Sequence, residues 1–200
     1  MIEFLLISHP YLVLLHANIT LTLKFLQTGT RLSIGKKNTI NKPRLARVIS
    51  GGQCGADLGG LLAAEYLGIA TGGMAAAGYR TEKGKQPILG TRFGLQQHAS
   101  WAYPPRTEHN VKHSCTTIIF ASNAESSGTT MTVDFTVKHR KEFLLVDINA
   151  YDINAIVEFM RKTNPEIINI AGNRESVSPN ITKKTRFLLC HALAKYLKND

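Results

Sequence analysis

Cysteine is scarce in this sequence, and the three cysteines form no recognisable motif. Cys54, Cys115 and Cys190 lie far apart, so none belongs to the CxxC pairs that bind zinc or exchange disulfides. An odd number of scattered cysteines is typical of reduced thiols in a cytosolic protein. We therefore expect free thiols, no disulfide framework and a cytoplasmic location.

The sequence also lacks a hydrophobic run long enough to cross a membrane. Its most apolar stretch, Ile2–Leu15, is interrupted by Glu3 and by Ser8-His9-Pro10, whereas a spanning helix needs about 20 apolar residues. A signal peptide would need a basic residue before this stretch, and the only early charge is the acidic Glu3. We expect no membrane partner, and a removed targeting peptide is the less favoured alternative.

Motifs for metal binding and for nucleophilic catalysis are missing as well. The seven histidines form neither HExxH nor HxH, and His109 and His113, which are four residues apart, would still need a third metal ligand. No Ser/His/Asp or Cys/His triad can be assembled. We expect no metal site and assign no catalytic residue.

Acidic residues are few, but the shortage is concentrated at one end of the chain. The whole sequence has a formal net charge of +10, which by itself suggests a nucleic-acid partner. Residues 1–47 hold seven Lys and Arg against one acid, a net of +6, whereas 48–200 hold 17 against 13, a net of +4. The main part of the chain therefore suits an anionic small molecule better than nucleic acid.

The first 44 residues differ in composition from the rest and are interpreted as an N-terminal appendage outside the core. Gly29–Arg44 is polar and basic and ends at Pro43-Arg44, like a linker. The appendage could supply an extra strand or helix, or reflect a start site placed too far upstream. Residues 45–200 are expected to form one ligand-binding domain, for which their length is sufficient.

From Leu45 onward, short apolar runs alternate with segments of helical periodicity. Runs of this kind, joined by helices, predict a Rossmann-like, doubly wound α/β fold with a mostly parallel five-stranded sheet and helices on both faces. The predicted strands are Leu45–Ser50, Ile69–Thr71, Thr116–Ala121, Phe143–Asp147 and Ile167–Ala171. The predicted helices are Asp57–Leu67, Tyr103–His113, Gly128–Arg140, Asp152–Lys162 and Pro179–Leu197. Met74–Arg92 is glycine-rich and is predicted to be a long irregular loop.

Glycine and hydroxyl residues follow most of the predicted strands. In sheets of this kind, ligands bind beyond the carboxyl ends of the strands, where the strand order reverses. We expect the first and third strands to be neighbours there, so that their following loops face each other. The segments concerned are Gly51–Asp57, Gly72-Gly73, Ser126–Thr130 and Gly172–Ser176.

Gly51–Asp57 joins a strand to a helix and is the first candidate for anion binding. Glycines let backbone N–H groups approach an anion, and a helix N-terminus adds a partial positive charge. The loop is neither GxGxxG nor a Walker motif, so neither NAD nor ATP is implied. The alternative is a tight turn in which Asp57 only caps the helix. Ser127–Thr130 repeats the pattern after the third strand, with a serine or threonine cap as the alternative.

Three further polar clusters could complete such a site. Arg106 and Asn110 share a helix face, and the guanidinium could bind a phosphate or carboxylate; the alternative is a solvated helix face. Arg80 lies in the long loop, which could also be a mobile surface loop. Arg174 and Glu175 follow the last strand and could equally form a turn with a helix cap. Trp101 and Tyr103 could stack on a base or simply pack.

The candidate ligand-binding residues all belong to these clusters. They are Gly51, Gly52, Gln53, Gly55, Asp57, Gly73, Arg80, Arg106, Asn110, Gly128, Thr129, Thr130, Arg174 and Glu175.

Six motifs occur in order and resemble those of the putative molybdenum carrier family. They are Gly51-Gly52-Gln53-x-Gly55-x-Asp57, Gly72-Gly73, Arg80-Thr81-Glu82, Arg106-Thr107-x-x-Asn110-Val111, Gly128-Thr129-x-x-Thr132 and Ala171-Gly172-x-Arg174-Glu175-Ser176. The resemblance covers about residues 45–198. It implies membership of the wider SLOG group of Rossmann-like proteins, which includes the LOG phosphoribohydrolases and the DNA-processing protein DprA.

The resemblance implies a small anionic ligand: molybdate, molybdenum cofactor or a nucleotide. Molybdate is a tetrahedral dianion like phosphate, so the sequence does not separate them. LOG enzymes carry a glutamate where this chain has Thr132, which argues against LOG-type hydrolysis. Cys115 and Ala75-Ala76-Ala77 also depart from the family pattern.

Two other functions stay open at this point. One is a nucleotide hydrolase or transferase that uses Asp57 or Glu175 as acid or base. The other is a DprA-like nucleic-acid or protein-interaction module, which would need a basic stripe on the domain. A homo-oligomer is compatible with either function.

Overall fold

The computed structural model describes residues 45–198 of the chain. The predictions for the N-terminal appendage, residues 1–44, lie outside the described residues. No helix in the described part of the chain is long and apolar enough to cross a membrane.

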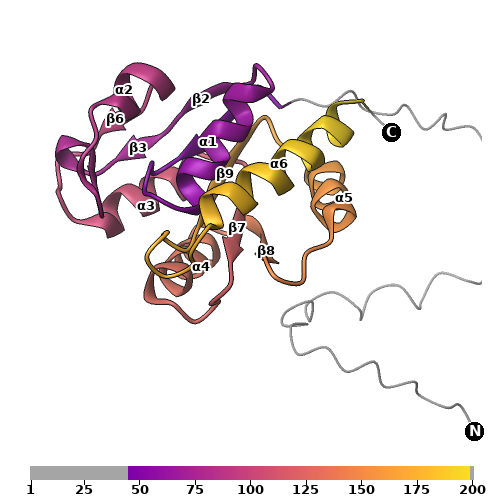
Figure 1. Cartoon of the computed structure of the whole chain (residues 1–200). Helices are drawn as coiled ribbons and strands as arrows, with labels where there is room; N and C mark the ends of the chain where they lie inside the picture. The colour runs from indigo at the N-terminus through magenta and orange to yellow at the C-terminus, as the bar shows by residue number, and fades with distance from the viewer. Residues whose placement is uncertain (1–44, 199–200) are drawn as a thin grey trace, which may run out of the picture. The chain divides into compact units, whose positions relative to one another are not determined.

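Five parallel strands form the central sheet, in the order β2-β1-β9-β7-β8 (Figure 1). They are β1 (Arg47–Ser50), β2 (Ala70–Gly72), β7 (Thr116–Ala121), β8 (Glu142–Asp147) and β9 (Ile167–Gly172). All six residues of β7 are buried, as expected for a strand that is covered on both faces. The predicted five-stranded parallel sheet is confirmed.

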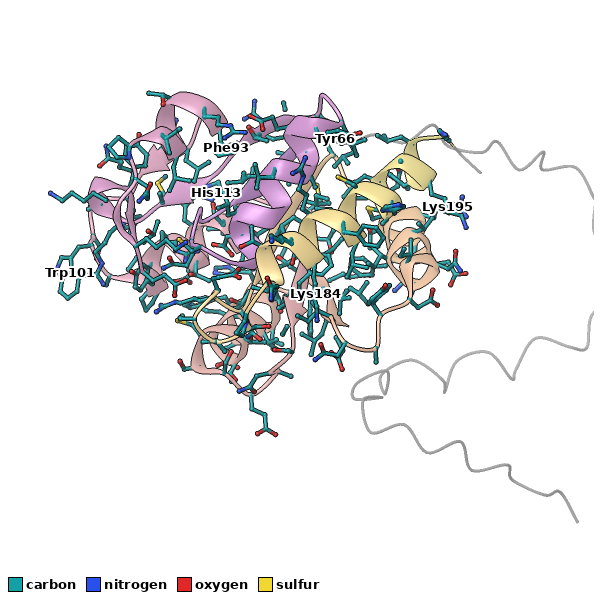
Figure 2. All side chains as sticks on the ribbon, viewed as in Figure 1. Tyr66, Phe93, Trp101, His113, Lys184 and Lys195 are labelled. Carbon is teal, nitrogen blue, oxygen red and sulfur yellow. The ribbon has the colours of Figure 1, made fainter. Side chains whose placement is uncertain are left out.

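The helices form two groups that cover the sheet. α1 (Ala56–Tyr66) packs against α6 (Ile181–Lys198), which also packs against α5 (Ile153–Thr163). α3 (Tyr103–Lys112) and α4 (Ser127–Lys138) pack against each other. Side chains fill the space between the helices and the sheet (Figure 2). The main core includes Val48, Ile118, Phe120, Ile156, Met160, Ile170, Leu188 and Leu189.

The strand order differs from the predicted one at the centre of the sheet. β9 lies between β1 and β7 and pairs in parallel with both. The prediction that the first and third strands are neighbours is therefore wrong. The prediction fails because the last strand of the chain lies in the middle of the sheet. Because all strands are parallel, the loops after β1, β9 and β7 still lie at one sheet edge.

The segment from Met74 to Arg92 is more ordered than predicted. It contains β3 (Met74–Ala75), the 3₁₀ turn η1 (Ala77–Tyr79), β4 (Arg80–Thr81), β5 (Gly84–Lys85) and α2 (Ile88–Phe93), and β6 (Gln96–Gln97) pairs with β3. A second, smaller core holds it against α1, with Leu61, Ala75, Leu89, Phe93 and Leu95 buried. Elements of two to six residues carry no readable periodicity, which is why the sequence indicated a loop.

The start of α6 is stabilised by Glu175, five residues before Asn180. One carboxylate oxygen accepts the Asn180 N–H, and the other accepts the Thr182 N–H at 3.1 Å and the Thr182 hydroxyl at 2.7 Å. These groups are free donors at a helix N-terminus, so Glu175 acts as a cap. Burial raises the pKa of Glu175, but the hydrogen bonds from Thr182 and Asn180 outweigh it and hold the pKa below its usual value.

Glycine is required at Gly73, where β1 and the chain after β2 approach closely. Its φ is +120°, and a Cβ atom built there would lie 2.2 Å from the Ser50 carbonyl oxygen. The preceding Gly72 has no such constraint, because the nearest atom to its Cβ would be Arg47 Cδ at 3.6 Å.

We predict that Gly73→Ala destabilises the fold by more than about 2 kcal/mol, because the backbone must move away from Ser50. Gly72→Ala is the matched control and should change the free energy of unfolding by less than about 0.5 kcal/mol. Urea unfolding of both variants measures the difference. Equal midpoints for the two would contradict the close approach.

We also predict that Glu175→Ala lowers the free energy of unfolding at pH 7 by about 1 kcal/mol, as for other helix caps. The folded-state pKa is depressed, so this stabilisation is complete above the usual glutamate pKa of 4.5 and is lost as pH falls through the folded-state value. Urea unfolding between pH 7 and pH 3 should show the variant and the parent converge. Glu158→Ala, an exposed position on α5, serves as the control, and a pH-independent difference would rule out a charged cap.

Candidate functional site

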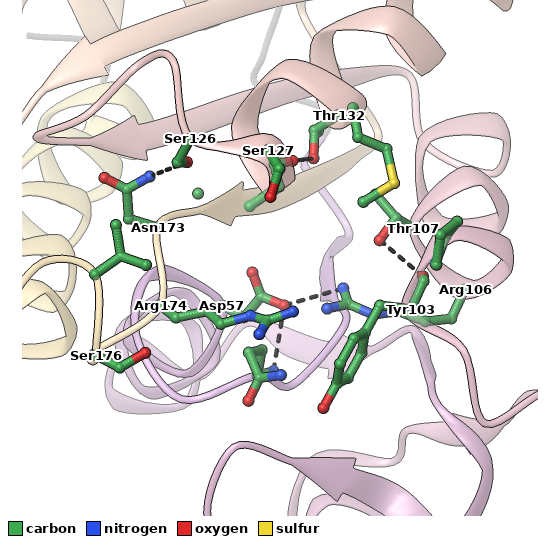
Figure 3. A pocket seen from close by; sticks show the side chains of 17 residues that line it. Asp57, Tyr103, Arg106, Thr107, Ser126, Ser127, Thr132, Asn173, Arg174 and Ser176 are labelled. Carbon is green, nitrogen blue, oxygen red and sulfur yellow. Dashed lines mark hydrogen bonds and ion pairs between the residues drawn. The ribbon is translucent and has the colours of Figure 1, made fainter.

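A cavity of about 380 Å³ opens at the carboxyl edge of the sheet, close to β9 (Figure 3). Its walls come from the loops after β1, β7 and β9 and from the start of α3. The lining residues are Gln53, Asp57, Tyr103, Pro104, Arg106, Thr107, Ser126, Ser127, Gly128, Met131, Thr132, Ala171, Gly172, Asn173, Arg174, Ser176 and Val177. The volume lies within the range of small-molecule sites.

A buried ion pair joins α1 and α3 at this cavity. One Asp57 carboxylate oxygen accepts from Arg106 Nη1 at 3.2 Å and from the Gln53 backbone N–H, also at 3.2 Å. Asp57 is 4% exposed and Arg106 is 8% exposed. Gly51 makes this possible, since a Cβ there would lie 1.6 Å from Arg106 Nη1. Gly51 therefore provides space for the guanidinium.

Among the residues that line the cavity, Asp57 has the only carboxyl group. Burial raises the pKa of Asp57, and the Arg106 charge and the Gln53 N–H offset part of that increase. A buried carboxyl with a raised pKa in a cavity is a candidate acid or base. The other carboxylate proposed for such a role, Glu175, is occupied as the cap of α6.

One buried N–H donor beside the cavity, Arg106 Nε, has no hydrogen-bond acceptor among residues 45–198. The Gln53 side chain, in contrast, hydrogen-bonds the Tyr103 hydroxyl. The Gln53 amide orientation is well defined, because its oxygen accepts from the Cys54 N–H at 3.0 Å and the Glu82 N–H at 2.8 Å. Leaving a buried donor unpaired costs about 1–3 kcal/mol.

The N-terminus of α4 contributes further donors. The Ser126 side chain does not cap the helix; its hydroxyl instead donates to Thr129 Oγ1 at 3.0 Å. The N–H groups of Ser127 and Gly128, in the first turn, have no intrahelical acceptor. A Cβ at Gly128 would meet no atom within 4 Å. This helix end is therefore open, and its partial positive charge favours an anion.

Asn173, directly after β9, holds the loops together. Its side-chain oxygen accepts the N–H groups of Ser122 and Asn123, both at 3.0 Å. Its side-chain nitrogen lies 2.8 Å from Ser126 Oγ and 2.9 Å from Thr129 Oγ1. Its backbone oxygen accepts the Ala56 N–H at the start of α1. The start of α1 is thus partly covered by the β9 loop, and the α4 start is the more open of the two.

Tyr103, at the start of α3, lines the cavity beside several guanidinium groups. The Arg174 guanidinium lies 4.6 Å from the ring centroid and that of Arg80 lies 4.9 Å from it. Burial alone raises the pKa of the Tyr103 phenol, but the hydrogen bonds from Arg80 and Gln53 and the charges of Arg80 and Arg174 bring it below its usual value.

Five of the candidate residues named from the sequence line the cavity. They are Gln53, Asp57, Arg106, Gly128 and Arg174. Arg80 lies next to this group and contacts it through Tyr103. Gly51 lies beneath the Arg106 guanidinium.

The other candidates have structural contacts instead. Gly52 has a φ of +70° and packs beside Leu95, and Gly55 lies against the Asn173 carbonyl oxygen. Asn110 links α3 to β3, because its side chain exchanges two hydrogen bonds with the backbone of Met74. The structure places the remaining candidates as follows: Gly73 against Ser50, Thr129 beside Asn173, Thr130 exposed with its hydroxyl on the Ser126 carbonyl, and Glu175 at the α6 cap.

Several lining residues were not among those candidates. The main ones are Tyr103, Thr107, Ser126, Ser127, Thr132, Asn173 and Ser176. Asn173 and Ser176 belong to the polar cluster after the last strand, and the central position of that strand would have identified them. Thr132, which occupies the LOG glutamate position, lines the cavity, and its hydroxyl donates to the Gly128 carbonyl at 2.8 Å. No group of three or more metal-ligating side chains occurs within the described part of the chain.

The similarity to known proteins matches this architecture. A family model described as "Circularly permutated YpsA SLOG family" matches residues 48–193. The chain is also similar to a protein of known structure, the "Putative molybdenum carrier protein" of Syntrophus aciditrophicus SB. The two are 30% identical, with a TM-score of 0.69, over 78% of this chain and 97% of that protein. No curated protein matches the sequence.

A permuted chain order accounts for a last strand that lies at the centre of the sheet, and the family match covers nearly all of the described residues. The chain therefore belongs to the circularly permuted YpsA branch of the SLOG family.

Proposed function

We propose that this protein binds an oxyanionic or phosphate-bearing small molecule in the cavity beside β9. The observation that supports it best is that the guanidinium of Arg174, which forms no ion pair within residues 45–198, lines the same cavity as the open N-terminus of α4. The first N–H groups of a helix have no acceptor within the helix. A ligand rich in acceptor oxygens would satisfy them and the guanidinium.

The charges at the cavity favour an anion as well. Asp57 offsets the charge of Arg106, with which it is paired. Arg174 lines the same cavity and has no ion-pair partner among residues 45–198. Together with the α4 N-terminus, Arg174 gives the cavity a positive balance. Hydrogen bonds from charged donors to an oxyanion are about twice as strong as neutral ones.

The ligand we propose is a molybdenum species, either molybdate or molybdenum cofactor, with a nucleotide as the alternative. The name of the similar S. aciditrophicus protein supports molybdenum. Molybdate and phosphate are both tetrahedral and dianionic, so the same donors would bind either. In this proposal the protein is a carrier that holds its cargo without changing it.

We predict that inorganic phosphate and molybdate bind to the purified protein, and that Arg174→Ala weakens both by about 1.5–3 kcal/mol, the value of a hydrogen bond to a charged group. Isothermal titration calorimetry measures the affinities. Arg186→Ala, an exposed arginine on α6, is the matched control and should bind like the parent. If the two variants bind equally well, the anion does not occupy this cavity.

An enzymatic role is the second candidate, and the buried Asp57 carboxyl is the observation in its favour. A general acid must lie within hydrogen-bond reach of the reacting group, and Asp57 lines the cavity. Against it, Thr132 occupies the LOG glutamate position and its hydroxyl is engaged by the Gly128 carbonyl.

We predict that the protein releases no adenine from AMP, because Thr132 cannot take a glutamate's role. Chromatographic analysis of AMP after incubation with the protein tests this. Adenine release that is lost in Asp57→Asn would instead establish the enzymatic role. Glu175→Gln controls for a general loss of carboxylate, since Glu175 lies at the α6 cap and does not line the cavity.

A further inference from the structure

Three guanidinium groups surround the ring of Tyr103. The distance from the guanidinium carbon to the ring centroid is 4.6 Å for Arg174, 4.9 Å for Arg80 and 5.7 Å for Arg106. Arg80 also donates from Nε to the Tyr103 hydroxyl at 3.3 Å. Arginine on an aromatic face is common, but three arginines on a single ring concentrate like charges in a small volume.

The carboxylates near this cluster do not balance its charge. Asp57 forms an ion pair with Arg106 and also interacts electrostatically with Arg174, so a single carboxylate faces both guanidinium groups. Glu82, two residues from Arg80, accepts instead from the Ser176 hydroxyl. Within the described residues, neither Arg80 nor Arg174 forms an ion pair. Like charges that are held close together are destabilising unless an anion lies between them.

Trp101 extends the cluster outward. Its ring lies 4.9 Å from the Arg80 guanidinium, which therefore stacks on both Trp101 and Tyr103. Trp101 is 66% exposed and projects from the molecule (Figure 2). Such stacking fixes the plane of a guanidinium and leaves its edge N–H groups available to an anion.

The arginine cluster and the α4 N-terminus lie at opposite sides of one cavity. In Figure 3, Ser126 and Ser127 lie on one side, and Arg174, Tyr103 and Arg106 lie on the other. A volume of about 380 Å³ is large for one tetrahedral oxyanion, since a water molecule takes about 30 Å³. The cavity therefore has room for a longer ligand with a negative group at each end.

We propose that this cavity recognises an elongated ligand with two anionic groups. One tetrahedral oxyanion binds between the N-terminus of α4 and Arg174, which both line the cavity. The second anionic group binds at Arg80, just outside the cavity lining, and the connecting part lies against Tyr103. This inference rests on the proposed anion-binding function. It adds a second anion subsite and makes Arg80 a determinant of ligand selectivity.

The experiment compares ligands that differ only in a second phosphate. Fructose 6-phosphate and fructose 1,6-bisphosphate form one pair, and AMP and adenosine 3′,5′-bisphosphate form another with a different spacing. Calorimetry should show at least one bisphosphate binding about tenfold more tightly than its monophosphate, as expected for an additional charge-assisted contact. Inorganic phosphate serves as the probe for the α4 subsite alone.

Arg80→Ala should reduce that preference to less than about threefold while leaving the affinity for inorganic phosphate unchanged within about twofold. Lys85→Ala is the matched control, because Lys85 is an exposed cation on the same β4–β5 hairpin. It should keep the preference. Thermal melting verifies that both variants are folded.

Trp101 provides an independent readout, since it is the only tryptophan in the chain. Its fluorescence should change when a bisphosphate binds and stay constant with inorganic phosphate. Equal affinities within both ligand pairs, or an unchanged preference in Arg80→Ala, would overturn the second subsite while leaving the α4 site intact. Failure of every anion to bind, inorganic phosphate and molybdate included, would overturn the proposed function as well.

Discussion

Parallel pairing of β9 with both β1 and β7 is the constraint that builds the cavity. It brings the end of the last strand between two loops that lie about 70 residues apart in the sequence, at Gln53 and Asn123. Asn173 then holds both loops, through its backbone to Ala56 and through its side chain to the start of α4. Without this strand, the polar residues after β1 and β7 would have no common neighbour.

The electrostatics of the cavity depend on the buried ion pair between Asp57 and Arg106. Burying Asp57 and Arg106 together is costly, and their mutual attraction recovers part of that cost. The pair leaves Arg106 Nε without an acceptor, and Arg174 forms no ion pair in the described chain. If the proposed function holds, an acceptor-rich ligand in the cavity would stabilise the fold, and binding and stability would be linked.

Much of the fold could be predicted from local patterns. The apolar run at Thr116–Ala121 is a buried strand with those limits, and the predicted ends of the other strands and long helices lie within two residues of the observed ones. Strand order was not predictable, because five apolar runs carry no information about which of them are neighbours. The short elements between Met74 and Phe93 were missed because they depend on a second core formed with Leu61, which is distant in sequence.

The residues of the candidate site were likewise only partly predictable from the sequence. Charged groups such as Asp57 and Arg106 stood out in glycine loops or on a helix face, and both line the cavity. The glycines were harder to interpret, since Gly51 provides space for a guanidinium and Gly55 for the Asn173 carbonyl. Tyr103 and Asn173 act through contacts with residues more than 20 positions away, and such contacts leave no local signal in the sequence.

The central position of β9 also has a consequence for biosynthesis. A ribosome releases the residues of β1, β2, β7 and β8 first, and until Ile167–Gly172 emerge, β1 and β7 each have an unpaired inner edge. The sheet is therefore completed only near the end of translation, and this late long-range pairing slows folding. No nascent chain that ends before Val177 contains the complete cavity, because Ser176 and Val177 are the last residues of its lining. Under the proposed function, cargo loading would have to follow the completion of synthesis, and an incomplete translation product would not sequester the ligand.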